Sequence, residues 1–317
     1  AALREFLVAL DRYRAYVRPG RTADAEDSAV LADAARRAAA ELPPEAVAAL
    51  TELHALADGT ATGADPEAAA EFVIRFQQVT GALVAKGVED TAFYRWTQLL
   101  TLCDVGADPS RFGLTPDQLH DWLELVNAGW PATMTLGSTH DSKRSEDVRA
   151  RIAAISEYPD EWTELVTALD GPAAALPPRM RSIWWQTLAG TWDSAGPLAA
   201  DRLAAYLVKA GREQKLWTSW VEPDHAAEEA AAGAVPGILA DPAVRERFSA
   251  WVDLVAESVA TNTLSAKLVQ LTALGVADLY QGQETVRLSV TDPDNRRQVD
   301  FDHLAGHLAA ALDGGTA

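Results

Sequence analysis

The chain of 317 residues carries 27 basic and 46 acidic side chains, which gives a formal charge of −19 at pH 7. This charge disfavours binding to nucleic acid and to anionic membrane surfaces, because both partners are themselves anionic. No apolar run approaches the ~20 residues of a membrane-spanning helix, so no membrane partner is expected. Cys103 is the only cysteine, which excludes an internal disulfide framework and makes the cytoplasm the expected compartment.

The first part of the chain predicts helices. Apolar residues from Leu3 to Val17 recur at three- and four-residue steps, and Arg18-Pro19-Gly20 follows them as a stop signal. Ala-rich stretches at 24–40 and 43–57 also favour helix. The small and polar residues of Asp58–Asp65 predict a linker. The helical pattern starts at once and without an initiating Met, so we expect a piece of a longer chain.

Two later segments depart from the helical pattern. Residues 131–137 alternate between apolar and small or polar side chains, which predicts a short strand. The segment Val276–Tyr280 predicts a buried strand. It follows a predicted helix whose leucines share one face and which ends at Gly275. Polar residues come directly after both strands, which is where active sites lie in α/β barrels.

Several predicted helices surround these two strands. One begins at Thr115, where Pro116 and Gln118 complete a capping pattern. Four more are expected near 160–169, 180–188, 203–217 and 244–259, so a helical subdomain is inserted if both strands belong to one sheet. The predicted organisation is a helical insertion at 1–65, a segment at 66–157 with a strand at about 131–139, a helical insertion subdomain at 158–258, and a last helix, strand and following segment at 259–317.

Common catalytic motifs are missing from the sequence. It holds no phosphate-binding loop, dinucleotide-binding GxGxxG, HExxH or GxSxG, and its six His and one Cys lack zinc-ligand spacing. We therefore expect no cofactor and no metal.

The densest polar cluster is Ser138–Asp147, and it allows two interpretations. Asp141 or Ser142 could cap a helix whose first turn carries Glu146 and Asp147. Alternatively, a strand delivers His140 and Asp141 into an active site. There Asp141 would stabilise a cationic transition state and His140 would bind a substrate hydroxyl.

Two further clusters also have a structural and a functional interpretation. Lys86–Arg95 is either a functional loop or a helix start with Glu89 and Asp90 in its first turn. Arg212–Trp220 reads as an ion-paired helix end with two packed indoles. Ten tryptophans fit a protein that handles sugars, because indoles stack on sugar rings, but tryptophan is also an ordinary core residue.

These clusters, in this order, resemble the maltooligosyl trehalose synthases, a family of the α-amylase superfamily. The matching segments are KGVEDTAFYR (86–95), STHDSKRSEDVRARI (138–152), REQKLWTSW (212–220), DLYQGQE (278–284) and DPDNRR (292–297). Departures from the family pattern are Ser142, Leu274, Ala277 and Gln283. The resemblance implies a mainly α chain that is a fragment of an amylase-type (β/α)8 barrel, holding its last two strands and large helical insertions.

The resemblance also implies a reaction on a maltooligosaccharide substrate. The α-1,4 bond at the reducing end is converted within the molecule to an α,α-1,1 bond, which leaves a trehalose end. Asp141 would be the transition-state stabiliser. The implied substrate-binding residues are His140, Lys143, Arg144, Tyr280, Gln281 and Glu284, with Lys86, Glu89 and Asp90 at the reducing-end subsite.

Two carboxyl groups that such a reaction needs are not recognisable in this sequence. A retaining glycosidase uses a nucleophile and an acid/base, and neither the GxRxDxxx strand end nor the following Glu strand is found. Both are expected upstream, so the chain would be inactive alone and its partner would be the remainder of the same enzyme chain. The alternatives are another amylase-type hydrolase or transglucosylase, and a non-catalytic helical binding module.

Overall fold

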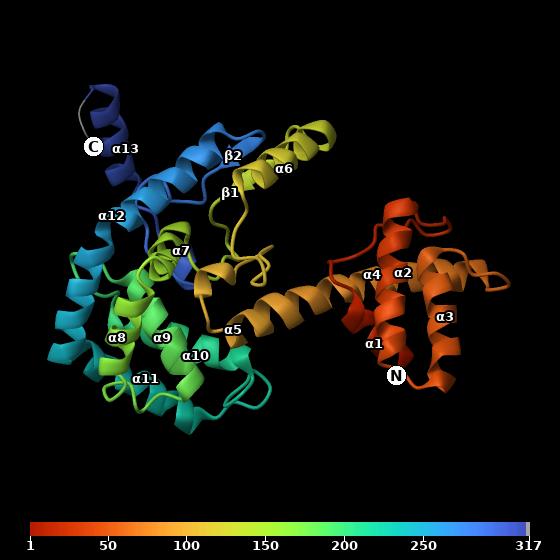
Figure 1. The fold of residues 1–317 in the computed structure, drawn as a ribbon, viewed down its shortest axis with the longest axis horizontal. Coiled ribbons are helices and arrows are strands. Elements are labelled where there is room, and N and C mark those ends of the chain that lie inside the picture. Colours follow the sequence, from red (N-terminus) through yellow and green to blue (C-terminus); the bar gives the residue numbers. More distant parts are fainter. Residues whose placement is uncertain (315–317) are drawn as a thin grey trace. The chain divides into compact units, whose positions relative to one another are not determined.

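The computed structural model describes residues 1–314, in which helices joined by loops predominate. The chain divides into two compact units, with the boundary between Ala92 and Phe93. Figure 1 shows the helices of each unit. None of the described helices combines the length and the apolar composition needed to cross a bilayer.

The first unit is a small helical bundle with its own core. Phe6, Leu31 and Leu50 are almost completely buried, and the Phe6 and Phe76 rings lie 5.2 Å apart. Its helices are α1 (Ala2–Ala9), α2 (Ala25–Ala40), α3 (Pro44–Asp58) and α4 (Pro66–Val84), and α4 continues into a π-helical stretch, η1 (Ala85–Ala92).

Two expectations for this unit need correction. The predicted helix from Leu3 to Val17 is wrong beyond Ala9, because the following residues run without helix and bury Leu10 and Val17. There the Gln77 side chain donates a hydrogen bond of 2.8 Å to the Val17 carbonyl. The unit also extends past the expected boundary at 65/66, because α4 packs against α1 and α3.

The second unit is also mainly helical. Its α-helices are α5 (Phe93–Arg95), α6 (Pro116–Gly129), α7 (Glu146–Ala153), α8 (Pro159–Ala168), α9 (Pro178–Thr191), α10 (Ala200–Gln214), α11 (His225–Ala240), α12 (Pro242–Thr272) and α13 (Phe301–Leu312). Short 3-10 turns occur at η2 (Leu100–Leu102), η3 (Ala154–Ser156) and η4 (Asp294–Arg296). The four helices expected between the strands are therefore present, and α11 is an addition. Residues 315–317 of the predicted last segment lie outside the described residues.

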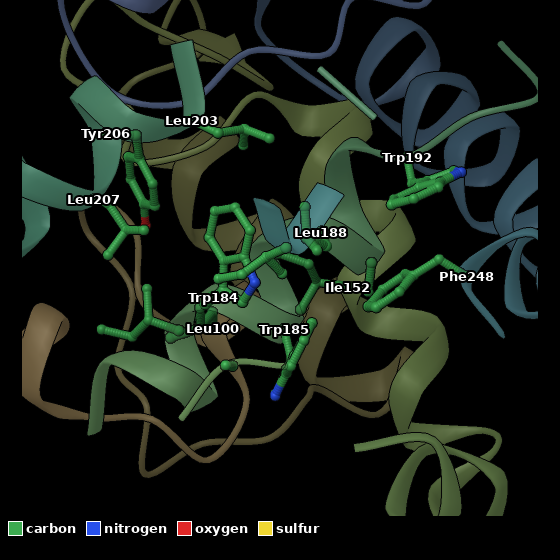
Figure 2. Close-up of a cluster of buried hydrophobic side chains, with 14 of the residues drawn as sticks. Leu100, Ile152, Trp184, Trp185, Leu188, Trp192, Leu203, Tyr206, Leu207 and Phe248 are labelled. Carbon is green, nitrogen blue, oxygen red and sulfur yellow. The ribbon is translucent and has the colours of Figure 1, made fainter. Parts of the chain in front are cut away.

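Helix α9 forms the centre of the large core. Figure 2 shows Trp184 surrounded by apolar side chains from several elements, and the Trp192 ring stacks on Phe248 at 5.2 Å. At Gly190 a Cβ would lie 2.7 Å from Val148 Cγ1, so only glycine lets α9 approach α7 this closely. Trp184 and Trp185 are at most 3% exposed, so both are core residues.

Both expected strands are present and belong to one sheet. Strand β1 (Met134–Leu136) pairs in parallel with β2 (Val276–Asp278), with Thr135 opposite Ala277. They are shorter than the predicted strands, and the prediction that the second strand is buried is wrong, because Val276–Asp278 is exposed. Gly275 precedes β2 at φ 112°, and a Cβ there would lie 2.5 Å from the Thr133 carbonyl oxygen. Parallel pairing places the residues that follow the two strands at the same edge of the sheet.

Candidate active site

The loop after β1 presents His140 and Asp141 to solvent. Both residues are exposed, whereas Ser142, Lys143, Arg144 and Ser145 behind them are buried. The predicted cap at Asp141 or Ser142 is wrong, because Ser145 caps α7 and accepts from the Val148 amide at 3.4 Å. The Asp141 carboxylate is therefore not used to cap the helix.

Lys143 approaches Asp141 from the protein interior. Its side chain is 2% exposed, and its Nζ lies 3.6 Å from Asp141 Oδ1. Opposite charges at this distance attract each other. The Asp141 carboxylate is therefore exposed, and its ion-pair partner Lys143 lies on the buried side of the loop.

Asp104, which the sequence analysis did not single out, supports this loop. Its carboxylate accepts hydrogen bonds from the backbone N–H groups of Lys143 and Arg144, both at 3.3 Å. Arg149 Nη1 donates to the same carboxylate at 3.1 Å. Asp104 is about 40 residues from the loop, so no local sequence pattern indicates this role.

The Arg144 guanidinium is enclosed in the protein. The residue is 1% exposed, and its Nη2 donates to the Tyr206 hydroxyl at 2.9 Å. Burial opposes its charge, but Tyr206, Tyr94 and Asp104 outweigh this effect and raise the pKa of Arg144. Burial also raises the pKa of the neighbouring Cys103 thiol to about 11, which keeps it protonated near neutral pH.

The start of α7 is joined to the segment that follows β2. Ser145 N donates to Ser289 O at 3.0 Å, and Ser145 Oγ donates to Arg287 O at 2.8 Å. Arg287 N in turn donates to Asp147 Oδ2 at 2.8 Å. Burial raises the pKa of Asp147, although the bond from Arg287 acts in the opposite direction.

The residues after β2 lie at the same edge of the sheet as the His140–Asp141 loop. Gln281 and Glu284 are exposed and Tyr280 is half-buried. Gln281 Nε2 donates to the Tyr280 hydroxyl at 3.2 Å, and Gln270 bridges the strands by donating to the carbonyls of Thr135 and Asp278. Three polar side chains beside β2 are thus accessible to a ligand.

Lys86, Glu89 and Asp90 belong to the first unit. They lie in the π-helical stretch η1, not in the first turn of a new helix. Lys86 pairs with Asp90, and the buried Glu89 accepts a hydrogen bond from the Tyr13 hydroxyl.

The segment Arg212–Trp220 is held by a buried carboxylate. Arg212 donates to both oxygens of Glu228, at 2.8 and 2.7 Å, and Thr218 Oγ1 donates to Glu228 at 2.6 Å. These bonds, chiefly that of Arg212, lower the pKa of Glu228 to about 2. Trp217 packs against Gly211, while the Trp220 ring is half exposed and lies 4.8 Å from the Arg212 guanidinium carbon.

The same segment contacts the end of Lys86–Arg95. Arg95 Nε donates to Gln214 O at 2.7 Å, and Gln214 Nε2 donates to Tyr94 O at 2.8 Å. Two of the matching segments thus meet in the second unit.

A cavity of about 520 Å³ lies between α6, β1, α7 and α12, but neither His140 nor Asp141 lines it. Apolar residues such as Trp122 and Val269 form much of its wall, so we interpret it as incomplete packing between strand and helices. Within residues 1–314 no three His, Cys, Asp or Glu side chains gather as metal ligands would.

Comparison with curated proteins finds one kind of relative. The chain is 38% identical over 265 residues to a putative maltooligosyl trehalose synthase of Mycobacterium tuberculosis. That match covers 80% of this chain and 34% of the relative, so the chain spans about a third of the relative's length. No model of a known protein family matches the sequence.

Solved structures give the same relationship. Maltooligosyltrehalose synthase from Arthrobacter ramosus is 38% identical with a TM-score of 0.85, over 99% of this chain and 39% of that chain. A hypothetical maltooligosyl trehalose synthase of Sulfolobus tokodaii is 28% identical with a TM-score of 0.75, over 94% of this chain and 38% of that one. Over the segment that it spans, the chain is therefore homologous to the maltooligosyl trehalose synthases.

Proposed function

We propose that this chain supplies part of the active site of a maltooligosyl trehalose synthase. The reaction converts the reducing-end α-1,4 bond of a maltooligosaccharide to an α,α-1,1 bond by transfer within the molecule. The observation that carries the proposal is the likeness to the Arthrobacter ramosus synthase at 38% identity and a TM-score of 0.85. The paired strands would then be the last two strands of an amylase-type barrel.

The residues after β1 would act on the sugar ring at the bond that breaks. Exposed Asp141 would stabilise the positive charge that develops on the anomeric carbon, since fixed charges in a preorganised site stabilise transition states strongly. Lys143 would hold Asp141 in place from behind, and His140 would bind a sugar hydroxyl. Because the Arg144 guanidinium is buried, a supporting role fits it better than direct sugar contact.

The remaining site residues would grip the substrate. Tyr280, Gln281 and Glu284 would line the site beside β2. Lys86, Glu89 and Asp90 would close the reducing-end subsite, where the released glucose must be held away from water before it is rejoined. The nucleophile and the acid/base would come from the remainder of the enzyme chain, since this sequence has no recognisable motif for either.

The test follows reducing ends while the full-length gene product that contains this sequence is incubated with maltopentaose. A fall in reducing ends at constant total sugar is expected. A rise would indicate a hydrolase instead, and no change would favour a binding module. The 317-residue chain by itself is expected to give no turnover, and turnover would contradict the assignment of the two missing carboxyl groups.

The role of Asp141 has its own test in the active protein. Asp141→Asn should lower kcat about 10²- to 10³-fold, the usual effect of removing one preorganised electrostatic contact. Asp160→Asn, an exposed carboxylate in the first turn of α8, is the matched control and should leave kcat unchanged. A loss below tenfold for Asp141→Asn would contradict the role.

A further inference from the structure

The segment Asp292–Arg297 matches the family pattern, yet the proposed function gives it no task. Asn295 in this segment is 4% exposed and reaches the loop after β1. Its Nδ2 donates to the His140 carbonyl at 3.0 Å and to the Thr139 carbonyl at 3.4 Å. A residue some 155 positions away in the sequence therefore contacts the backbone that carries the candidate site.

The second contact on this backbone comes from Thr139. Its Oγ1 accepts a hydrogen bond of 2.9 Å from the Asp141 N–H. The His140 carbonyl and the Asp141 N–H belong to one peptide unit, whose atoms lie in a plane together with the Cα atoms of both residues. Asn295 thus holds the oxygen of this unit while Thr139 holds its N–H.

Asn295 is itself fixed to the helical core through its neighbour. Asp294 accepts two hydrogen bonds from Arg202 on α10, at 2.6 and 2.9 Å, and one from Val290 N at 3.0 Å. A bidentate arginine–carboxylate pair constrains geometry more than a single bond does. The position of Asn295 is therefore set by α10, not by the loop that it contacts.

We propose that Asn295 is a positioning residue that, with Thr139, fixes the peptide plane between His140 and Asp141. Holding this plane limits the directions in which the two side chains leave the backbone, so the carboxylate of Asp141 faces the substrate before binding. The Oδ1 of Asn295 is buried and without a hydrogen-bond partner, so the residue acts through its amide N–H groups. The inference rests on the proposed function of Asp141.

The principal test is Asn295→Asp, which keeps the shape but directs a carboxylate at two carbonyl oxygens. In the active protein it should lower kcat about tenfold to a hundredfold, the effect of misplacing a catalytic group by about 1 Å. KM for maltopentaose should change less than kcat, because His140 is the one proposed sugar-binding residue on this peptide plane. Asn295→Ala should show the same kcat and KM pattern more mildly, and it serves if Asn295→Asp does not fold.

The matched control is Asn262→Asp on α12, which removes a hydrogen bond of 3.0 Å to Glu157 and should not change kcat. Thr139→Val removes the other contact on the same plane. The double variant Thr139→Val/Asn295→Ala should lose kcat by a smaller factor than the product of the two single losses. Residues that act on one group are not additive. Independent effects that multiply fully, or an unchanged kcat in both Asn295 variants, would overturn the inference.

A second measurement does not depend on activity. Hydrogen exchange of the Asp141 amide, followed by NMR, should be at least about tenfold faster in Asn295→Ala than in the unchanged protein, because the peptide unit is released. An unchanged exchange rate would overturn the inference. If the unchanged protein does not consume reducing ends, the proposed function fails while this measurement still decides whether Asn295 holds the loop.

Discussion

The two halves of helix α12 differ in how they bury their apolar residues. In the first half Val244, Phe248 and Trp251 are at most 2% exposed and pack into the core around α9. In the second half Leu264 and Leu268 are 69% and 63% exposed, although they continue a leucine stripe.

The difference shows that an apolar stripe on a helix indicates a surface suited to packing. It does not show that the surface packed against it belongs to the same chain. The nearby strands behave like the second half of α12, with Met134 60% and Val276 51% exposed. Large apolar side chains that gather at the surface often mark an interaction site. This exposure supports the proposal that β1 and β2 are completed by further barrel strands.

The largest expected effect is a loss of stability from a substitution in the buried first half of α12. The Phe248 ring stacks on the rings of Trp185 and Trp192. Phe248→Ala should therefore leave a cavity between them and lower the free energy of unfolding by about 3–5 kcal/mol. Urea denaturation followed by far-UV circular dichroism measures this loss. A loss below about 1 kcal/mol would mean that the first half of α12 is not the core that its burial indicates.

Arg144→Met tests whether this residue belongs to the buried or to the substrate-facing part of the molecule. Loss of the guanidinium leaves the buried Tyr206 hydroxyl and Cys103 carbonyl without their donor, so stability should fall by about 1–3 kcal/mol. Arg179→Met, at an exposed position of α9, is the control and should change little. Unchanged stability with a raised KM would instead support direct contact with sugar.

The sequence predicted the elements whose signals are local. The capping box at Thr115 and Gln118, the helices between the strands and the two strands themselves all follow from short patterns. The early end of α1 could not be predicted, because burial of Leu10 and Val17 outweighed the helical periodicity of that stretch.

The position of His140 and Asp141 directly after a strand was predictable from the sequence, whereas the buried contacts behind them were not. Asp104 and Asn295 support this loop from about 40 and 155 positions away, so only tertiary folding brings them to it. The hydrogen bonds that join Ser145 to Arg287 and Ser289 are likewise non-local in the sequence.

A smaller effect concerns the ion pair that holds Arg212–Trp220. Because Arg212 lowers the pKa of Glu228 from 4.5 to about 2, the ionised carboxylate stabilises the fold above pH 4.5. This stabilisation is lost as the pH falls from 4.5 toward 2. Chemical denaturation across this range should therefore show a steeper loss of stability for the unchanged protein than for Glu228→Gln. Glu229→Gln, at an exposed neighbour, should keep the steep dependence, and equal slopes for all three proteins would contradict the role of the pair.

The smallest expected effect is in the exposed half of α12. Leu268→Ser removes a side chain that is 63% exposed, so the free energy of unfolding of the 317-residue chain should change by less than about 0.5 kcal/mol. Urea denaturation at two protein concentrations measures it beside Phe248→Ala. A loss above about 1 kcal/mol that grows with concentration would mean that a second copy covers this surface in solution. In the full-length gene product the same substitution should be clearly destabilising if further barrel strands pack there, because the leucine would then be buried.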